Sequence, residues 1–262
     1  MSPHTLLDTR ELPWEDNPGI PGGKMKVLAR ASEGWPSVIL NWLPPGIGEG
    51  AEPHRHYHRT VREHGLVLHG ELPMVEFESL EAERGAAVLF REGYCMDRSP
   101  GSVHGLDPRF TSQIGFTILE WRTGTGTYLT EEGACEESIV LPAPAEVDEL
   151  APSGRPGVVV DGPALRLLDT RELPGEELDE WPGARIQRVA LGADGSTTTA
   201  IVQLAPGAAD PSSAICADAA RAYVLEGQIV LGSGRVLRAG CYADPVLGTC
   251  VAGATGGRVL RF

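Results

Sequence analysis

Histidines are concentrated in one part of this chain. Six of its seven histidines lie between positions 54 and 104, and His54, His56 and His58 alternate with other residues. Residues two apart on a β-strand share a face, so a strand here would point these imidazoles to one side. Glu63 follows shortly afterwards, and His104 comes from a distant segment. Imidazole and carboxylate groups that converge in this way suit Fe, Mn, Ni, Cu or Zn.

The intervals in the first stretch resemble the first motif of the cupin superfamily. That motif is a glycine, five residues, His-x-His, four residues, a glutamate, six residues and a second glycine. Gly50, His56, His58, Glu63 and Gly70 match every interval. The match is specific because five positions agree at once.

A second stretch resembles the second cupin motif, which is a glycine, five residues, Pro-x-Gly, two residues, a histidine, three residues and an asparagine. Gly93, Gly101 and His104 match it. Ser99 stands in place of the proline, and Pro108 stands in place of the asparagine. These departures concern the turn and the strand edge and leave the ligand position intact.

The resemblance implies an RmlC-like cupin barrel that binds one divalent metal ion. By that resemblance the ligands are His56, His58, Glu63 and His104. The opening segment from Asp8 to Trp14 and the phrase Pro-His-Arg-His also resemble cupins of the ChrR type, on fewer residues.

The choice of histidines stays open at one position. His54 shares strand parity with His56 and His58 and could replace one of them as a ligand. The spacing to Glu63 favours His56 and His58, which leaves His54 near the metal. No separate catalytic triad is visible, so His54, Tyr57 and Tyr94 are the candidates for an acid or base.

Two other histidines are expected to play no part in the site. His64 follows Glu63 directly and should therefore face outward. His69 is expected near the rim of the barrel, at the end of its strand.

An internal repeat organises the chain. The octapeptide Leu-Leu-Asp-Thr-Arg-Glu-Leu-Pro occurs at 6–13 and again at 167–174. Eight identical residues indicate a duplication, and further short β-favouring runs closed by glycine recur in the same order. The sequence therefore predicts an all-β chain of two barrels in tandem. The predicted parts are a metal-binding cupin barrel at 1–128, a linker at 129–159 and a degenerate cupin barrel at 160–262.

The second copy has kept the glycines and lost the ligands. Counting back from Gly227 places Ser213, Ile215 and Ala220 at the first three ligand positions, and Val251 is the fourth after Gly240. These side chains cannot assemble a comparable metal site. The second barrel is expected to be structural.

Charge and cysteine content limit the partners and the compartment. The formal net charge of −14 disfavours binding to nucleic acids and membrane surfaces. Five cysteines without a CxxC pair indicate a reducing compartment, and neither a signal sequence nor a long apolar run is present. A cytoplasmic protein is expected, with a small-molecule substrate and possible homodimers.

Three functional hypotheses follow. A site of three histidines and one carboxylate leaves coordination positions open for a substrate, which suits a metal-dependent enzyme. A dioxygenase acting on a small oxygenated organic molecule is the first hypothesis, and cupin isomerase, lyase or decarboxylase chemistry is an alternative. The second is a metal-binding or small-molecule sensor without turnover. The third is a structural protein that keeps its histidines only by descent.

Overall fold

The computed structural model is built from β-strands throughout the residues that it describes, as predicted for an all-β chain. None of these residues forms a helix that could cross a membrane. The described residues are 5–18, 20–32, 34–46, 54–106, 112–123, 138–141, 146–149, 155–192, 194–211, 221–245 and 250–262.

The chain divides into two compact units. One unit comprises Trp14–Glu172, and the other comprises Met1–Pro13 together with Leu173–Phe262. Each unit is therefore assembled mainly from one copy of the repeat, but the strand that opens each octapeptide belongs to the unit of the other copy. The predicted parts at 1–128, 129–159 and 160–262 differ from these units, because each predicted barrel includes the octapeptide of its own copy.

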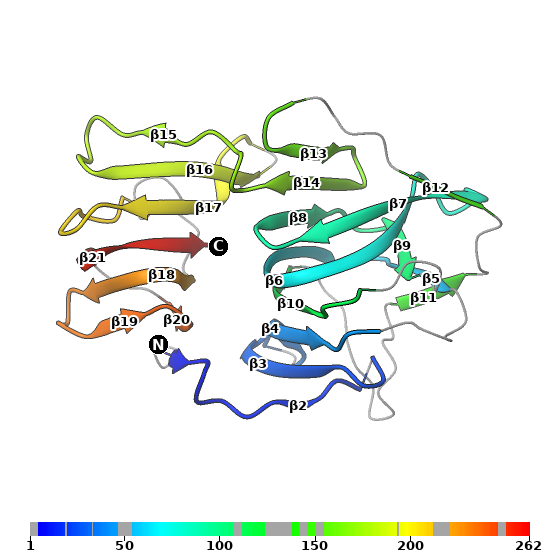
Figure 1. Cartoon of the computed structure of the whole chain (residues 1–262), viewed down its shortest axis with the longest axis horizontal. Helices are drawn as coiled ribbons and strands as arrows, with labels where there is room; N and C mark the ends of the chain where they lie inside the picture. The colour runs from blue at the N-terminus through cyan, green and yellow to red at the C-terminus, as the bar shows by residue number, and fades with distance from the viewer. Residues whose placement is uncertain are drawn as a thin grey trace. The chain divides into compact units, whose positions relative to one another are not determined.

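The first unit, Trp14–Glu172, contains the candidate metal ligands and is a curved, mostly antiparallel arrangement of strands (Figure 1). Its first strands are β2 (Glu15–Asp16), β3 (Lys24–Arg30), β4 (Pro36–Leu43), β5 (His54–His58), β6 (Arg62–Phe77), β7 (Arg84–Arg91) and β8 (Tyr94–Arg98). They are followed by β9 (Val103–Leu106), β10 (Phe116–Thr123), β11 (Ser138–Leu141), β12 (Glu146–Glu149), β13 (Val158–Asp161) and β14 (Leu165–Asp169).

The long strand β6 pairs with different strands along its two halves. Its first half pairs with β8 and β10, and its second half pairs with β7 and β9. The strand changes direction near Gly70, which has a φ of 79°. A Cβ at Gly70 would collide with the carbonyl oxygen of Gly115. The second glycine of the first motif is therefore required both by its backbone conformation and by a close approach of two strands.

The interior of the unit is apolar at one end and polar at the other. Inward-facing side chains from six strands form one buried apolar cluster, which includes Val67 and Met74 on β6 and Ile118 on β10. The same inward parity continues along β6 to Glu63 and along β10 to Glu120. The inward-facing residues of β6 and β10 are thus apolar in the core and charged at the end of the barrel where the histidines lie.

The predicted linker, 129–159, contributes strands to this unit where it is described. β11 pairs with β5, β12 runs parallel to β7, and β13 pairs with β14. The remainder of the segment lies outside the described residues.

The octapeptide of the second copy completes the first unit. Its strand β14 pairs antiparallel with β8, with Leu168 opposite Cys95. Beyond the strand, the backbone N–H and the hydroxyl of Thr170 both donate to the carbonyl oxygen of Gly93. Gly93 is the first glycine of the second motif, so the turn that opens this motif is held by residues of the second repeat.

The second unit, Met1–Pro13 with Leu173–Phe262, is a smaller sheet of the same design. Its strands are β1 (Thr5–Asp8), β15 (Glu176–Glu177), β16 (Ala184–Leu191), β17 (Thr197–Leu204), β18 (Ala222–Leu231), β19 (Val236–Arg238), β20 (Cys241–Asp244) and β21 (Cys250–Arg261). The octapeptide of the first copy pairs here, because β1 runs antiparallel to β20. Thr9 donates its N–H and its hydroxyl to Gly240, as Thr170 does to Gly93. The exchange of octapeptides between the copies is therefore reciprocal.

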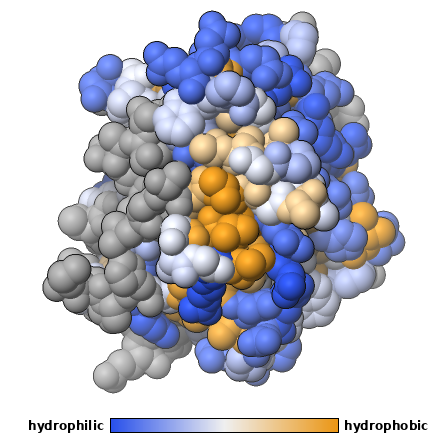
Figure 2. Space-filling model, turned by 90° about the vertical axis from the view of Figure 1, so that its left-hand side faces the viewer, coloured by the Kyte–Doolittle hydropathy of each residue, from blue (hydrophilic) through white to orange (hydrophobic). Residues whose placement is uncertain are grey.

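Most large hydrophobic side chains that the structure describes are buried. Figure 2 shows one face of the molecule, on which hydrophobic side chains gather in the middle, with hydrophilic ones above, below and to the right of them. Large hydrophobic side chains described as exposed are Trp14, Leu80, Ile114, Leu191, Val236 and Val251.

Candidate metal centre

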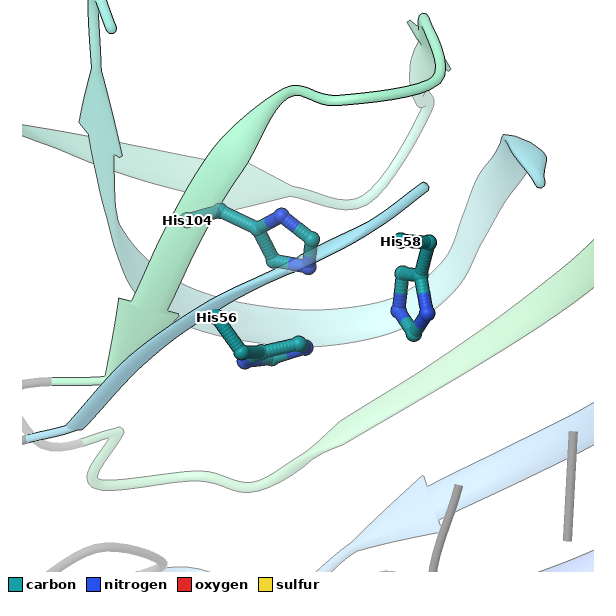
Figure 3. Close-up of side chains that lie close together, drawn as sticks. All are labelled: His56, His58 and His104. Atoms are coloured by element: carbon teal, nitrogen blue, oxygen red, sulfur yellow. The ribbon is translucent and has the colours of Figure 1, made fainter. Parts of the chain in front are cut away.

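Three imidazoles converge inside the first unit. One ring nitrogen from each of His56, His58 and His104 lies within 4.8 Å of the others (Figure 3). The ring centroids of His56 and His104 are 4.3 Å apart, and those of His56 and His58 are 5.2 Å apart. The structure thus brings together three of the four residues that the resemblance implied as ligands.

Strand pairing explains this convergence. His56 stands directly opposite His104 in the antiparallel pair β5–β9, so both side chains project from the same face. His58 is two residues further along β5 and shares that face. Alternation along one strand and register between two strands therefore suffice to place all three rings.

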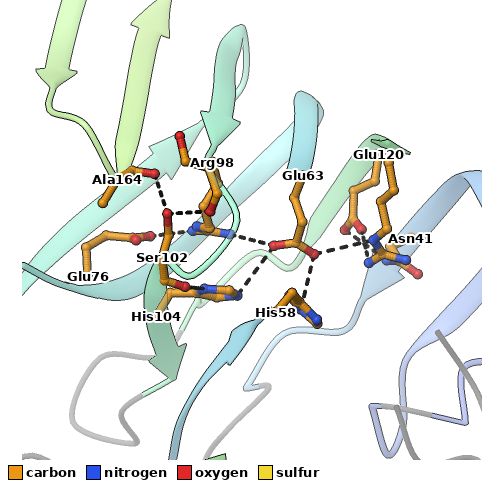
Figure 4. Close-up of polar contacts among 11 residues, drawn as sticks. Asn41, His58, Glu63, Glu76, Arg98, Ser102, His104, Glu120 and Ala164 are labelled. Atoms are coloured by element: carbon orange, nitrogen blue, oxygen red, sulfur yellow. Dashed lines mark hydrogen bonds and ion pairs between the residues drawn. The ribbon is translucent and has the colours of Figure 1, made fainter. Parts of the chain in front are cut away.

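Glu63, at the start of β6, reaches two of these imidazoles. One carboxylate oxygen lies 3.4 Å from Nε2 of His58, and the other lies 3.5 Å from Nε2 of His104 (Figure 4). The side chain of Glu63 is buried, as are those of His58 and His104. The fourth implied ligand is therefore beside the histidine group, although the group of mutually close donors contains only the three imidazoles.

Two buried arginines hold the same carboxylate. Nη1 of Arg98 lies 3.3 Å from one oxygen of Glu63, and Nε of Arg122 lies 3.3 Å from the other. Each arginine also binds a second glutamate, because Arg98 contacts Glu76 and Arg122 contacts Glu120. The result is a chain of five charges of alternating sign, in which Glu63 and the two arginines are buried and the outer glutamates are partly buried.

This environment sets the protonation of the donors. Burial by itself would raise the pKa of Glu63, but the positive charges around it, which include the guanidinium groups of Arg122 and Arg98, outweigh burial and hold the pKa well below the usual value. Burial lowers the pKa of His104 well below its usual value, and the charge of Arg98 acts in the same direction. An ionised carboxylate and a neutral imidazole are the forms that bind metal ions.

The outer glutamates behave differently. Burial raises the pKa of Glu76 and of Glu120, and the guanidinium groups beside them oppose this rise only in part. Asn41 adds a further contact by donating its amide to Glu120 at 2.9 Å.

The tautomer of His104 is set by a backbone carbonyl. Nδ1 of His104 lies 3.2 Å from the carbonyl oxygen of Ser102, which can only accept a hydrogen bond. Nδ1 must therefore carry the proton, and the lone pair of Nε2 is directed toward Glu63 and the other imidazoles.

These residues fit a divalent metal ion. Three imidazoles and one ionised carboxylate suit Fe, Mn, Ni, Cu or Zn. The three glutamates and two arginines also leave one net negative charge when all are ionised. A buried cluster of this kind is better balanced with a cation than without one.

The structure places two of the three predicted acid or base candidates, Tyr57 and Tyr94, away from the histidine group. Tyr57 lies between His56 and His58 on β5, hence on the opposite face, and it packs against a separate cluster that includes Phe77 and Val103. Tyr94 packs against the apolar interior instead. It lies at the far end of β8 from Arg98, with the guanidinium group of Arg171 5.8 Å from its ring. The side chain of His54 lies outside the described residues, so its role stays a prediction.

The two histidines expected outside the site do lie elsewhere. His69 is largely exposed, beside Glu92. His64 occupies the face of β6 opposite Glu63, as alternation requires. Contrary to the predicted outward-facing position, its side chain is buried, because its ring stacks on that of Trp121 with the ring centroids 5.4 Å apart.

The intervals that resemble the cupin motifs do not include the two arginines or the outer glutamates. A signal for two of them was present, because Glu120 and Arg122 interrupt the apolar run of β10 at the same strand parity. Arg98 precedes the turn of the second motif, and Glu76 lies near the end of β6. Nothing local in the sequence relates these two to Glu63, because their contacts depend on strands paired across the barrel.

The interior of the second unit has different polar groups. Three of the counted ligand positions, Ser213, Ile215 and Ala220, lie outside the described residues. The fourth, Val251, is exposed, whereas its neighbours Cys250 and Ala252 are buried.

A buried ion pair is found in the same unit. Arg261 donates through Nε and Nη2 to Asp210, and both side chains are buried. In the second unit Arg261 pairs with Ala222, and in the first unit Glu120 pairs with Gly65. Arg261 and Glu120 therefore occupy corresponding positions of the two copies. The charge at this interior position is thus reversed between the two copies.

Comparisons with known proteins agree with the fold. No family model and no curated protein matches the chain. Among solved structures, one described as a glyoxylate-induced protein from Pseudomonas aeruginosa matches with a TM-score of 0.61 and 14% identity, covering 100% of this chain and 88% of that one. A single-residue variant of oxalate decarboxylase from Bacillus subtilis matches with a TM-score of 0.55 and 13% identity, covering 98% and 76%. An oxalate decarboxylase from Lactobacillus farciminis, solved as a formate complex, matches with a TM-score of 0.54 and 12% identity, covering 98% and 85%.

These likenesses extend over nearly the whole chain. Together with the strand topology and the histidine-rich site, they confirm the predicted fold, which is two cupin barrels in a single chain. At this level of identity they establish the fold alone.

Proposed function

We propose that the first barrel holds one divalent metal ion through His56, His58 and His104, with Glu63 as the fourth ligand. The mutual approach of three imidazole nitrogens within 4.8 Å carries this proposal. We further propose that the chain is a metal-dependent enzyme for a small oxygenated organic substrate, in the first instance a dioxygenase.

A bound metal ion would supply Lewis acidity, and a redox-active one could also supply electrons to dioxygen. The residues of the chain would exclude water from the metal ion and orient its ligands. His58, Glu63 and His104 are buried, whereas His56 is only partly so. A substrate would therefore reach the centre from the side of His56. Arg98 and Arg122 would hold the carboxylate of Glu63 in place.

A second candidate reaction is decarboxylation of a small carboxylic acid. The structural neighbours include oxalate decarboxylases, and the one from Bacillus subtilis is described as having Mn(II) centres. Isomerase or lyase chemistry and a sensor without turnover remain further alternatives, since the same donor set serves all of them.

The metal proposal is tested by elemental analysis of the purified protein. Wild type should contain about one equivalent of a divalent metal, and the double variant His56→Ala, His58→Ala should contain almost none. His69→Ala is the control, because this histidine is largely exposed and lies outside the site. Equal metal content in wild type and the double variant would show that the histidines do not bind metal.

The reaction is tested with the metal-loaded protein. Oxygen uptake upon addition of a diketone, a thiol or a catechol-like compound would support the dioxygenase. Release of carbon dioxide from small carboxylic acids without oxygen uptake would support the decarboxylase. Tightly bound zinc without either activity would favour the sensor.

A cytoplasmic location, the absence of nucleic-acid and membrane partners, and a homodimer complete the proposal. The location and the excluded partners derive from the acidic composition and the cysteine content. The homodimer derives from the tendency of β-barrel proteins with apolar strands to associate. Sedimentation analysis would test the homodimer.

A further inference from the structure

One turn of the first barrel is anchored on a backbone group from the second repeat. The turn Ser99–Ser102 leads into β9, which carries His104. The hydroxyl of Ser102 lies 2.6 Å from the carbonyl oxygen of Ala164 and 2.6 Å from that of Ser99. The backbone N–H of Ser99 also donates to the carbonyl oxygen of Ala164 at 2.9 Å. Ala164 lies three residues before the second octapeptide and therefore belongs to the second copy.

The same turn controls the imidazole of His104. The carbonyl oxygen of Ser102 faces Nδ1 of His104 at 3.2 Å, which leaves Nε2 unprotonated on the side of Glu63 (Figure 4). Ser102 and His104 are both buried, so water has little access to replace these contacts. A continuous path of hydrogen bonds thus runs from Ala164 through Ser102 to the ring of His104.

We propose that Ser102 is a positioning residue of the metal centre, and that the second repeat supplies its anchor through the carbonyl group of Ala164. The hydroxyl of Ser102 fixes the turn, and the turn presents its carbonyl oxygen to Nδ1 of His104. The ring is then held in the tautomer and orientation that a metal ion requires. This proposal rests on the proposed metal site and gives the second copy a role in it.

The chain offers matched variants for a test. Ser102→Ala removes the hydroxyl, and Ser102→Thr retains it. Ser37→Ala is the control, because Ser37 is also a buried serine of the first unit, and its hydroxyl has no hydrogen-bond partner among the described residues. All variants are made in the full chain.

The first measurement needs no metal. Long-range proton–nitrogen NMR correlations of the metal-free protein report which nitrogen of His104 carries the proton. Wild type, Ser102→Thr and Ser37→Ala should show only the Nδ1–H form, and Ser102→Ala should show a mixture of both forms. A wild-type ring protonated on Nε2 would overturn the proposal, and this outcome remains decisive even if Ser102→Ala fails to fold.

The second measurement uses cobalt(II) as the probe. Removing a residue that orients a ligand weakens metal binding by about 10–100-fold, so Ser102→Ala should lose affinity on this scale and change the visible absorption of bound cobalt. Ser102→Thr should restore both properties. Affinity and tautomer unchanged in Ser102→Ala would overturn the proposal. If wild type bound no cobalt, the proposed metal function would fail, whereas the NMR measurement would still decide the role of Ser102.

Discussion

The hydroxyl of Thr170 donates to the carbonyl oxygen of Gly93 at 2.7 Å and thereby joins the second repeat to the first barrel. Thr9 makes the same contact with Gly240 at 2.7 Å. The two copies of the octapeptide therefore make the same hydrogen bond to a glycine at corresponding positions of the two repeats. The barrel that carries the histidines is completed by the copy that lacks them.

Removing this contact should destabilise the first barrel. Thr170→Val deletes the hydroxyl and preserves the size of a buried side chain, so the free energy of unfolding should fall by about 1 kcal/mol. Thr170→Ser keeps the hydroxyl and should recover part of the loss. Urea unfolding provides the measurement, and a Thr170→Val variant as stable as wild type would contradict the expectation.

Breaking the chain of five charges should have a much larger effect. Arg98→Met leaves Glu63 and Glu76 without one shared guanidinium group, and the loss of one partner from a buried ion pair costs about 3–5 kcal/mol. The comparison is Arg155→Met, which breaks an exposed ion pair with Asp161 and should cost less than about 1 kcal/mol. Similar urea midpoints for the two variants would show that the chain of five charges contributes little to stability.

Gly70→Ala should be poorly tolerated. A methyl group there would strain a positive φ and collide with the carbonyl oxygen of Gly115, at a cost of about 3 kcal/mol or more. Gly22→Ala is the matched control, because its φ is 81° and no atom lies within 4 Å of the added carbon. That variant should lose only about 1–2 kcal/mol. Equal losses in thermal unfolding would mean that the close approach at Gly70 has no energetic weight.

Cys95 should resist thiol reagents in the folded protein. Its side chain is buried on β8, and burial raises the pKa of the thiol far above its usual value. The thiolate is the reactive form, so alkylation should be very slow at neutral pH. Mass spectrometry of the peptide that contains Cys95 should show labelling only after denaturation, and rapid labelling of the native protein would place this thiol in contact with solvent.

Much of the site could be predicted from the sequence because it depends on local periodicity. His56 and His58 share a face wherever the chain forms a strand, and glycines at turns set where each strand begins. The intervals that resemble the cupin motifs add Glu63 and His104. The motif glycines and the candidate ligands can be identified from residue type and spacing alone.

The candidate acids and bases show that local periodicity alone does not place a side chain at the site. Tyr57 is next to two candidate ligands in the sequence, yet alternation turns its ring away from them. Tyr94 faces the interior, but it lies at the apolar end. Proximity along the chain and even strand parity are therefore insufficient, because distance along the barrel also matters.

The sequence by itself determined the duplication, the all-β class and the histidines whose spacing indicates a metal site. Only the tertiary structure showed that each octapeptide pairs with a strand of the other copy. It also showed that Arg98 and Arg122 contact Glu63, and that Ala164 anchors the turn before His104. The physical reason is that these contacts join strands far apart in the chain. Their register is set by the packing of the whole barrel, which no local pattern of residues encodes.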